Sequence, residues 1–248
     1  MDVRSFVCGL LLALTIAWVV SYVPVSQVLT ETNLFRNRLT TPRLLLISFD
    51  GFRWDYIYHA KVPNIDWMIK RGVHATDGLK NNYITITAPN HYAIVTGLFE
   101  ESSGVISNKF YDPMLNETFD YFTTKEKTDP RLFHAGVPIW QLNDAAATPA
   151  ASYNGDSRAS ACFQWVGCDV PINNVSLPRY YSSYNESMTI DKFTDGVDQV
   201  VSWLTNSTNP PNLGVIYFDQ PDAIGHQYGP RDQRVLSAVE KMDTLLGK

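Results

Sequence analysis

The sequence predicts an α/β fold in which helices flank a central, mostly parallel sheet. Two apolar runs of strand length, residues 44–49 and 213–218, are each followed by a segment that carries an aspartate. Amphipathic helical patterns lie between these runs and after them. Strands that alternate with helices build parallel sheets, and open sheets of this kind bind ligands at the carboxyl ends of their strands. We therefore expect functional side chains directly after these two strands.

Local patterns predict the helices between and after the strands. A short helix is expected over residues 64–71, and a second helix begins near Thr87 and ends at Gly97. A third helix, before the second strand, has a clear apolar face made of Phe193, Val197, Val200, Val201 and Leu204. The apolar stripe of the last helix is made of Val235, Val239, Met242 and Leu246.

Acidic and imidazole side chains follow both predicted strands. Asp50 comes directly after the first strand, where it either points into a site or forms a turn with Gly51. Asp222 and His226 are expected in the loop after the second strand, and Gly225 would let the backbone turn both side chains toward one point. Carboxylate and imidazole are ligands that zinc accepts. The alternative for His226 is a solvated loop histidine.

Thr87 lies at or next to the N-cap of the second predicted helix. Pro89 fits the first turn of that helix, and threonine is favoured at an N-cap without any catalytic role. The same position also suits catalysis, because the positive field of a helix N-terminus favours an alkoxide and binds phosphate. Both interpretations of Thr87 stay open at this level.

Several motifs together resemble a known family. In chain order they are SFDGFRWDY at 48–56, TAPNHY at 87–92 with VTGL at 95–98, NKFYDP at 108–113, and the Pro-Asp and Gly-His pairs of 221–226. This set resembles the ectonucleotide pyrophosphatase/phosphodiesterase family, most closely its type 4 and type 5 branch. The resemblance covers residues 44–248 and implies an alkaline-phosphatase-like α/β fold, here expected in a C-terminally truncated form.

The resemblance implies a centre with two zinc ions. Asp50 would bind one zinc, Thr87 would be the nucleophile on that same zinc, and Asp222 and His226 would bind the other. Asn108 would donate a hydrogen bond to a phosphate oxygen. The implied activity is hydrolysis of extracellular nucleotide or dinucleotide polyphosphates, through a covalent threonine intermediate.

The resemblance also implies residues that contact the substrate. The segment WVGCDV at 165–170 and the Tyr-Asn pair at 184–185 match the family pattern, so Trp165, Asp169 and Tyr184 would line the nucleotide pocket. A buried tryptophan and a core tyrosine are the ordinary alternatives. The chain departs from the family at Ala88. The family commonly has an aromatic residue at this position that would stack on a nucleobase, and the loss of that stacking puts nucleotide affinity in question.

A second departure concerns the metal ligands. The family's remaining ligands are an Asp-His-Gly segment and a distant histidine, and the sequence contains no Asp-His pair. We therefore expect a fragment, a short isoform or an incomplete gene product. Two function classes remain: a zinc-dependent phosphodiesterase, and a catalytically incomplete glycoprotein of that family. A phosphomonoesterase or lipid phosphodiesterase on the same fold is a further alternative.

The N-terminal segment and the composition bear on localisation and partners. Residues 1–25 contain an uncharged apolar run that predicts a secretory signal peptide or an uncleaved signal anchor, and residues 26–43 are expected to be a linker. Either form would place residues 44–248 outside the cell or in a lumen, with membrane attachment in the second case. The net charge of −5 argues against a nucleic acid duplex as partner.

Glycosylation and cysteine patterns agree with export. Acceptor sequons begin at Asn116, Asn174, Asn185 and Asn206. In an oxidising compartment, Cys162 and Cys168 either form a short-loop disulfide or remain two free thiols.

Overall fold

The computed structural model describes residues 42–123, 128–133, 135–146, 158–185 and 189–248. The predicted signal segment 1–25 lies outside the described residues, as does nearly all of the predicted linker 26–43. Residues 43–248 form one compact unit. Within the described part of the chain, no helix has the length and apolar character needed to span a bilayer.

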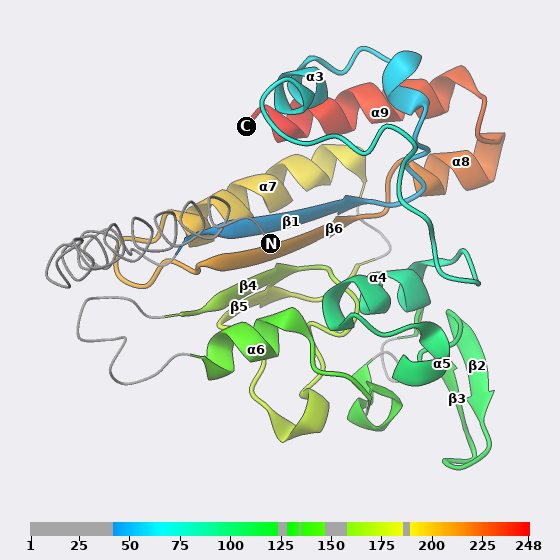
Figure 1. Ribbon diagram of the computed structural model, residues 1–248, viewed down its shortest axis with the longest axis vertical. Coiled ribbons are helices and arrows are strands. Elements are labelled where there is room, and N and C mark those ends of the chain that lie inside the picture. The colour runs from blue at the N-terminus through cyan, green and yellow to red at the C-terminus, as the bar shows by residue number, and fades with distance from the viewer. Residues whose placement is uncertain (1–41, 124–127, 134, 147–157, 186–188) are drawn as a thin grey trace, which may run out of the picture. The chain divides into compact units, whose positions relative to one another are not determined.

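The described residues contain a four-stranded parallel sheet in the order β1-β6-β4-β5 (Figure 1). Its strands are β1 (Leu44–Phe49), β4 (Ser160–Phe163), β5 (Tyr180–Ser182) and β6 (Leu213–Phe218). All three pairings are parallel. A separate antiparallel pair joins β2 (Lys109–Asp112) to β3 (Glu117–Asp120). The predicted α/β class and the parallel sheet are confirmed.

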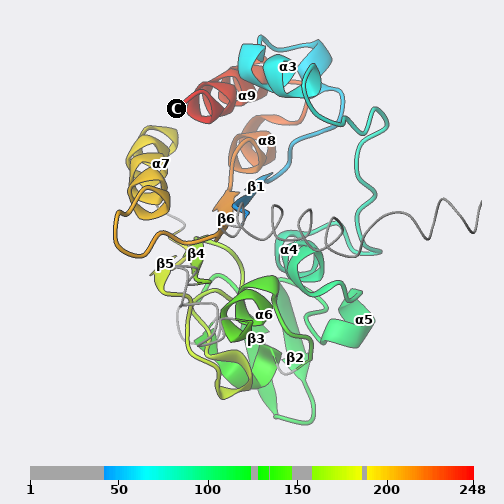
Figure 2. The ribbon, with the colours of Figure 1, turned by 60° about the vertical axis from the view of Figure 1, so that its left-hand side comes forward.

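Helices cover both faces of this sheet, as Figure 2 shows. The α-helices are α3 (Pro63–Ile69), α4 (Thr87–Thr96), α5 (Glu100–Ser103), α6 (Ile139–Ala145), α7 (Ile190–Leu204), α8 (Asp222–Tyr228) and α9 (Gln233–Leu246). Short 3₁₀ turns are η1 (Tyr56–Tyr58), η3 (Pro130–Phe133) and η5 (Ile172–Asn174). Four of the α-helices were expected from the sequence, at 64–71, from Thr87, around 193–204 and around 235–246.

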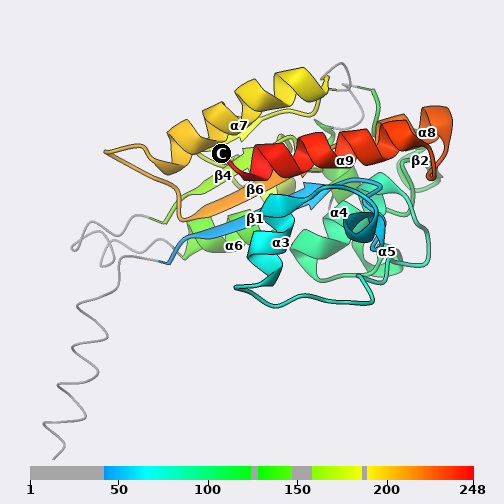
Figure 3. The ribbon, with the colours of Figure 1, turned by 90° about the horizontal axis from the view of Figure 1, so that it is seen from above.

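The two faces of β6 belong to two different cores. Val215 and Tyr217 pack into the cluster that includes α4 and α6 residues, whereas Ile216 and Phe218 pack against α7 and α9. All six residues of β6 are buried, which explains why its sequence is a continuous apolar run and not an alternating one. Figure 3 shows α7 and α9 lying over the same face of the sheet.

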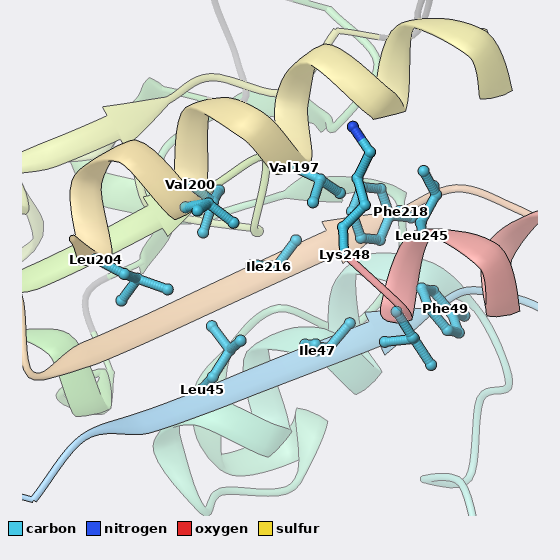
Figure 4. A pocket seen from close by; sticks show the side chains of 12 residues that line it. Leu45, Ile47, Phe49, Val197, Val200, Leu204, Ile216, Phe218, Leu245 and Lys248 are labelled. Atoms are coloured by element: carbon cyan, nitrogen blue, oxygen red, sulfur yellow. The ribbon is translucent and has the colours of Figure 1, made fainter. Parts of the chain in front are cut away.

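The α7 and α9 side of the sheet contains an apolar cavity of about 110 Å³ (Figure 4). Its lining includes Leu45, Ile47, Phe49, Val197, Val200 and Leu204. Lys248 lies at its border, and the Lys248 Nζ donates to Asp198 Oδ1 at 2.8 Å. None of the predicted site residues lines this cavity, so the gap belongs to the packing of α7 on β1 and β6.

A buried carboxylate fixes α3 against α9. Asp243 is only 1% exposed, and its Oδ1 accepts the backbone N–H of Ile65 at 2.8 Å. Its Oδ2 accepts both the backbone N–H and the Nδ2 of Asn64, each at 3.1 Å. The N–H groups of a helix's first turn have no partner within the helix, so the Asp243 side chain, which belongs to α9, caps the N-terminus of α3.

We expect Asp243→Ala to lower the free energy of unfolding by about 2 kcal/mol, because it leaves the half-buried N–H groups of Asn64 and Ile65 without an acceptor. Urea denaturation followed by circular dichroism measures the change. The control is Asp77→Asn, an exposed acid, which should stay within about 0.5 kcal/mol of the parent chain. Equal midpoints for Asp243→Ala and the parent would contradict the capping role.

Candidate active site

Asp50 and Asp222 meet because β1 and β6 end side by side. The two strands pair in register up to Phe49 and Phe218, and the pairing continues as the Asp50 N–H donates to the Phe218 carbonyl at 2.9 Å. The Asp222 N–H then donates to the Asp50 carbonyl at 3.0 Å. Gly51, at φ +65°, permits this approach, since a Cβ there would lie 2.6 Å from the Asp222 Cα.

The Asp50 carboxylate holds the Thr87 hydroxyl. Thr87 is the first residue of α4, and its Oγ1 donates to Asp50 Oδ2 at 3.0 Å. The Tyr217 hydroxyl donates to the same oxygen at 2.9 Å. The N-cap residue is Ile86, whose own side chain makes no capping hydrogen bond. The capping alternative for Thr87 is therefore wrong: its hydroxyl faces Asp50 and not the N–H groups of its own helix.

His91 fixes the first turn of α4 and was missed by the sequence analysis. Its Nδ1 lies 2.8 Å from the Thr87 carbonyl, and its Nε2 lies 2.8 Å from Ser48 Oγ on β1. A carbonyl can only accept, so Nδ1 carries the proton and the Ser48 hydroxyl donates to Nε2. Burial lowers the pKa of His91, against the opposing charge of Asp50, which agrees with a neutral ring. The available sequence signal was the i, i+4 spacing from Thr87.

Asp222 and His226 lie on a helix, not in the loop that the sequence analysis expected. Asp222 is the first residue of α8, and His226 lies near the end of that helix. Their i, i+4 spacing places both side chains on one helical face. His226 Nε2 lies 3.2 Å from Asp222 Oδ2. The helical period brings the two side chains together, so Gly225 is not needed as a flexible turn. The His226 side chain is 79% exposed and accessible to a ligand.

Asn108 lies against the first turn of α4, and Tyr184 lies against Tyr217. Asn108 Oδ1 accepts the backbone N–H of Ala88 at 2.7 Å, so its Nδ2 is the group left to donate. The ring of Tyr184 stacks on Tyr121, with centroids 5.2 Å apart, and meets Tyr217 edge-on at 5.9 Å. Asp169 contributes to the electrostatic environment of Tyr121, and its buried Oδ2 has no hydrogen-bond partner in the part of the chain that the structure describes.

The structure places Trp165 in the core. It is 1% exposed, and its Nε1 donates to the His91 carbonyl at 3.0 Å. This environment fits the alternative of a buried tryptophan. Ala88 is fully buried as well, so the family's stacking position is enclosed here, and Tyr121 covers one face of Tyr184.

The described residues match a zinc centre in donor type but not in number. Asp50 with Thr87 and Asp222 with His226 form two adjacent pairs of oxygen and nitrogen donors. Zinc takes three or four protein ligands. Within the described part of the chain, no group of three or more His, Cys, Asp or Glu side chains is placed to hold a metal.

The remaining predicted modification sites are accessible or paired. The asparagines of the sequons, Asn116, Asn174, Asn185 and Asn206, are all exposed. Cys162 and Cys168 are joined in a disulfide that links β4 to the loop after it, with Cα atoms 6.1 Å apart.

Burial and neighbouring charge raise the pKa values of Asp219 and Asp222. Burial raises the pKa of Asp219 to about 6, and the charges of Asp50 and Asp222 add to the shift. Burial also raises the pKa of Asp222, followed by the charge of Asp50. Asp219 Oδ1 is buried and has no hydrogen-bond partner among the described residues. Negative charge thus accumulates at the carboxyl ends of β1 and β6.

This accumulation predicts a pH-dependent stability for the metal-free chain. A carboxyl whose pKa is raised on folding stabilises the protein below its unfolded pKa, and that contribution is lost as pH rises through about 6 for Asp219. We expect Asp219→Asn to gain roughly 2 kcal/mol over the parent at pH 7 and little at pH 4. Urea midpoints in a chelator measure this. A gain equal at both pH values would contradict it, and Asp77→Asn is the matched control.

Known proteins resemble this chain over most of its length. Residues 44–248 match the family model described as type I phosphodiesterase / nucleotide pyrophosphatase. The chain is 40% identical over 207 residues to bis(5'-adenosyl)-triphosphatase ENPP4 of Homo sapiens. The aligned region covers 83% of this chain and 42% of that protein. Ectonucleotide pyrophosphatase/phosphodiesterase family member 5 of Homo sapiens is 37% identical over 205 residues, 83% of this chain and 39% of the relative.

Solved structures show the same likeness. An inactive variant of murine ectonucleotide pyrophosphatase/phosphodiesterase 5, in complex with AMP, superposes with a TM-score of 0.72 at 37% identity. The match covers 83% of this chain and 50% of that one, so the chain spans half or less of the relatives it matches. The matched model covers most of the chain and includes the residues around Asp50, Thr87 and Asp222, and the chain belongs to the type I phosphodiesterase / nucleotide pyrophosphatase family.

Proposed function

We propose that this chain carries the nucleophile and part of the metal site of a zinc-dependent phosphodiesterase or nucleotide pyrophosphatase. The observation that carries the proposal is the hydrogen bond from Thr87 Oγ1 to Asp50 Oδ2 at 3.0 Å, at the N-terminus of α4. A nucleophilic hydroxyl needs a neighbouring group that orients it and accepts its proton or lowers its pKa. The related murine structure described as inactive has a threonine replaced by alanine, which supports this role.

The residues of the chain would act in two steps. Thr87 Oγ forms a bond to phosphorus while the bond to the leaving oxygen breaks on the opposite side, and water then cleaves the phosphothreonine ester. Asp50 holds the hydroxyl in place, Tyr217 donates to the same Asp50 oxygen, and the Asn108 Nδ2 would donate to a non-bridging oxygen. Zinc bound by Asp50 with Thr87, and by Asp222 with His226, would supply positive charge for the attacking and leaving oxygens.

The proposed substrates are soluble extracellular nucleotides or dinucleotide polyphosphates. Two relatives support this class: one is named as a bis(5'-adenosyl)-triphosphatase, and another has a solved structure in complex with AMP. Tyr184 and Asp169 remain candidates for contacts to the nucleoside, whereas Trp165 would act through packing under His91. Exposed sequon asparagines support a secreted or membrane-anchored protein with this domain outside the cell.

A second candidate is a catalytically incomplete glycoprotein of the same family. The observation that favours it is the donor count, because the described residues supply two donors in each pair. Elemental analysis of the purified chain separates the two candidates. Stoichiometric zinc with turnover that a chelator removes supports the enzyme. Well under one zinc per chain, without phosphodiesterase activity above background, supports the second candidate.

The nucleophile assignment predicts that Thr87→Ala lowers turnover of a chromogenic nucleotide ester by about 10³-fold or more, because the attacking oxygen is lost. Thr87→Ser should keep measurable turnover, since it retains the hydroxyl. The matched control is Thr85→Ala, whose exposed side chain lies two residues upstream and should leave the rate unchanged. Turnover by Thr87→Ala at the parent rate would remove Thr87 from the mechanism.

A further inference from the structure

A second concave site lies beside the candidate active site, between the loop after β1 and the loop between α8 and α9. Its volume is about 390 Å³, within the usual range of roughly 300–1,000 Å³ for small-molecule sites. The residues that line it define what we call the basic pocket: Arg53, Tyr56, His59, Pro230, Arg231 and Leu236. None of them is a proposed ligand of zinc or a proposed nucleophile.

The charged groups of the basic pocket are mostly cationic. Arg53 binds the Asp55 carboxylate through Nε and Nη2, which fixes the guanidinium plane and leaves the N–H groups of Nη1 free to donate. His59 Nε2 lies 4.0 Å from the same carboxylate. Arg231 is exposed and has no acidic partner among the described residues. Among the described residues, Asp55 is the one carboxylate paired with groups that line the pocket, through Arg53 and His59, and the Arg231 guanidinium has no ion pair there.

The walls of the basic pocket are fixed before any ligand arrives. Tyr56 is 4% exposed and packs with Val235 and Val239 in one core cluster. Its hydroxyl donates to the Pro230 carbonyl at 2.9 Å, which ties the two loops together. The Arg53 Cζ lies 5.8 Å from the centre of the Tyr56 ring. Preorganised walls reduce the entropy that a ligand must lose on binding.

The basic pocket is next to the Asp222 end of the candidate active site. Arg53 follows Asp50 by three residues, and Pro230 follows His226 by four. Burial raises the pKa of Tyr56, the charge of Arg53 opposes that shift, and the charges of Asp55 and Asp222 add to it, so Asp222 is within electrostatic reach of the pocket wall. The two sites share the loop after β1 but use different side chains.

We propose that the basic pocket binds the phosphate group of a small soluble molecule. Guanidinium groups match phosphate oxygens with paired N–H donors, and they form stronger hydrogen bonds to anions than to neutral acceptors. The hollow that Tyr56, Pro230 and Leu236 help to form suits a small ligand better than the flat surface of a bilayer. The proposal concerns binding, so it stands whether or not Thr87 is a nucleophile.

Isothermal titration calorimetry with pyrophosphate tests the proposal. The chain is titrated in a chelator, so that no metal centre contributes to the heat. We expect saturable binding at one site and a loss of affinity of about tenfold in Arg231→Gln, because one charge-assisted partner is removed. Lys241→Gln, which removes one exposed positive charge from α9 outside the pocket, is the matched control and should bind as the parent does.

Three outcomes would overturn the proposal. The first is the absence of saturable pyrophosphate binding by the folded parent chain, with folding verified by circular dichroism. The second is an equal loss of affinity in Arg231→Gln and Lys241→Gln, which would indicate general charge attraction. The third is binding to phosphatidylcholine vesicles that contain phosphatidic acid without any binding of soluble pyrophosphate, which would identify a membrane surface as the ligand.

Discussion

The parallel pairing of β1 with β6 is the interaction on which the candidate active site depends. It places Asp50 and Asp222 at the same edge of the sheet, although the two residues are 172 positions apart in the sequence. The hydrogen bonds between strands continue past the last strand residues and end with the Asp222 N–H on the Asp50 carbonyl. Gly51 lets the two backbones touch, because a side chain there would collide with Asp222.

The position of Thr87 follows from this pairing and from one further connection. Ser48 and Asp50 both contact the first turn of α4, the first through His91 and the second through the Thr87 hydroxyl. Tyr217 approaches the same carboxylate oxygen from β6. These contacts join β1, α4 and β6 around one carboxylate. Burial raises the pKa of the neighbouring Asp219 and Asp222, and repulsion from the charge of Asp50 adds to both shifts. A bound cation would relieve that repulsion.

Sequence patterns predicted the architecture well because the apolar runs of β1 and β6 have a physical cause: both faces of β6 are covered. They also predicted Asp50, Thr87, Asp222 and His226 as site residues, because acids after strands and a hydroxyl at a helix start are local features, and the structure brings Thr87 to Asp50 and His226 to Asp222. They could not show which side chains meet across the sheet. His91, Tyr217 and Asp219 were therefore missed, and α8 was mistaken for a loop, because Gly225 and its short length hide the helical spacing.

The central claim is that Asp50 presents the Thr87 oxygen to phosphorus, and a covalent adduct tests it most directly. The chain, supplied with zinc, is mixed with a chromogenic nucleotide ester, quenched in acid within the first turnover, digested and mapped by mass spectrometry. The account predicts a nucleotidyl group on the peptide that contains Thr87, and fragmentation that assigns it to that side chain. A nucleotidyl group on any other side chain, during turnover by the parent chain, would contradict it.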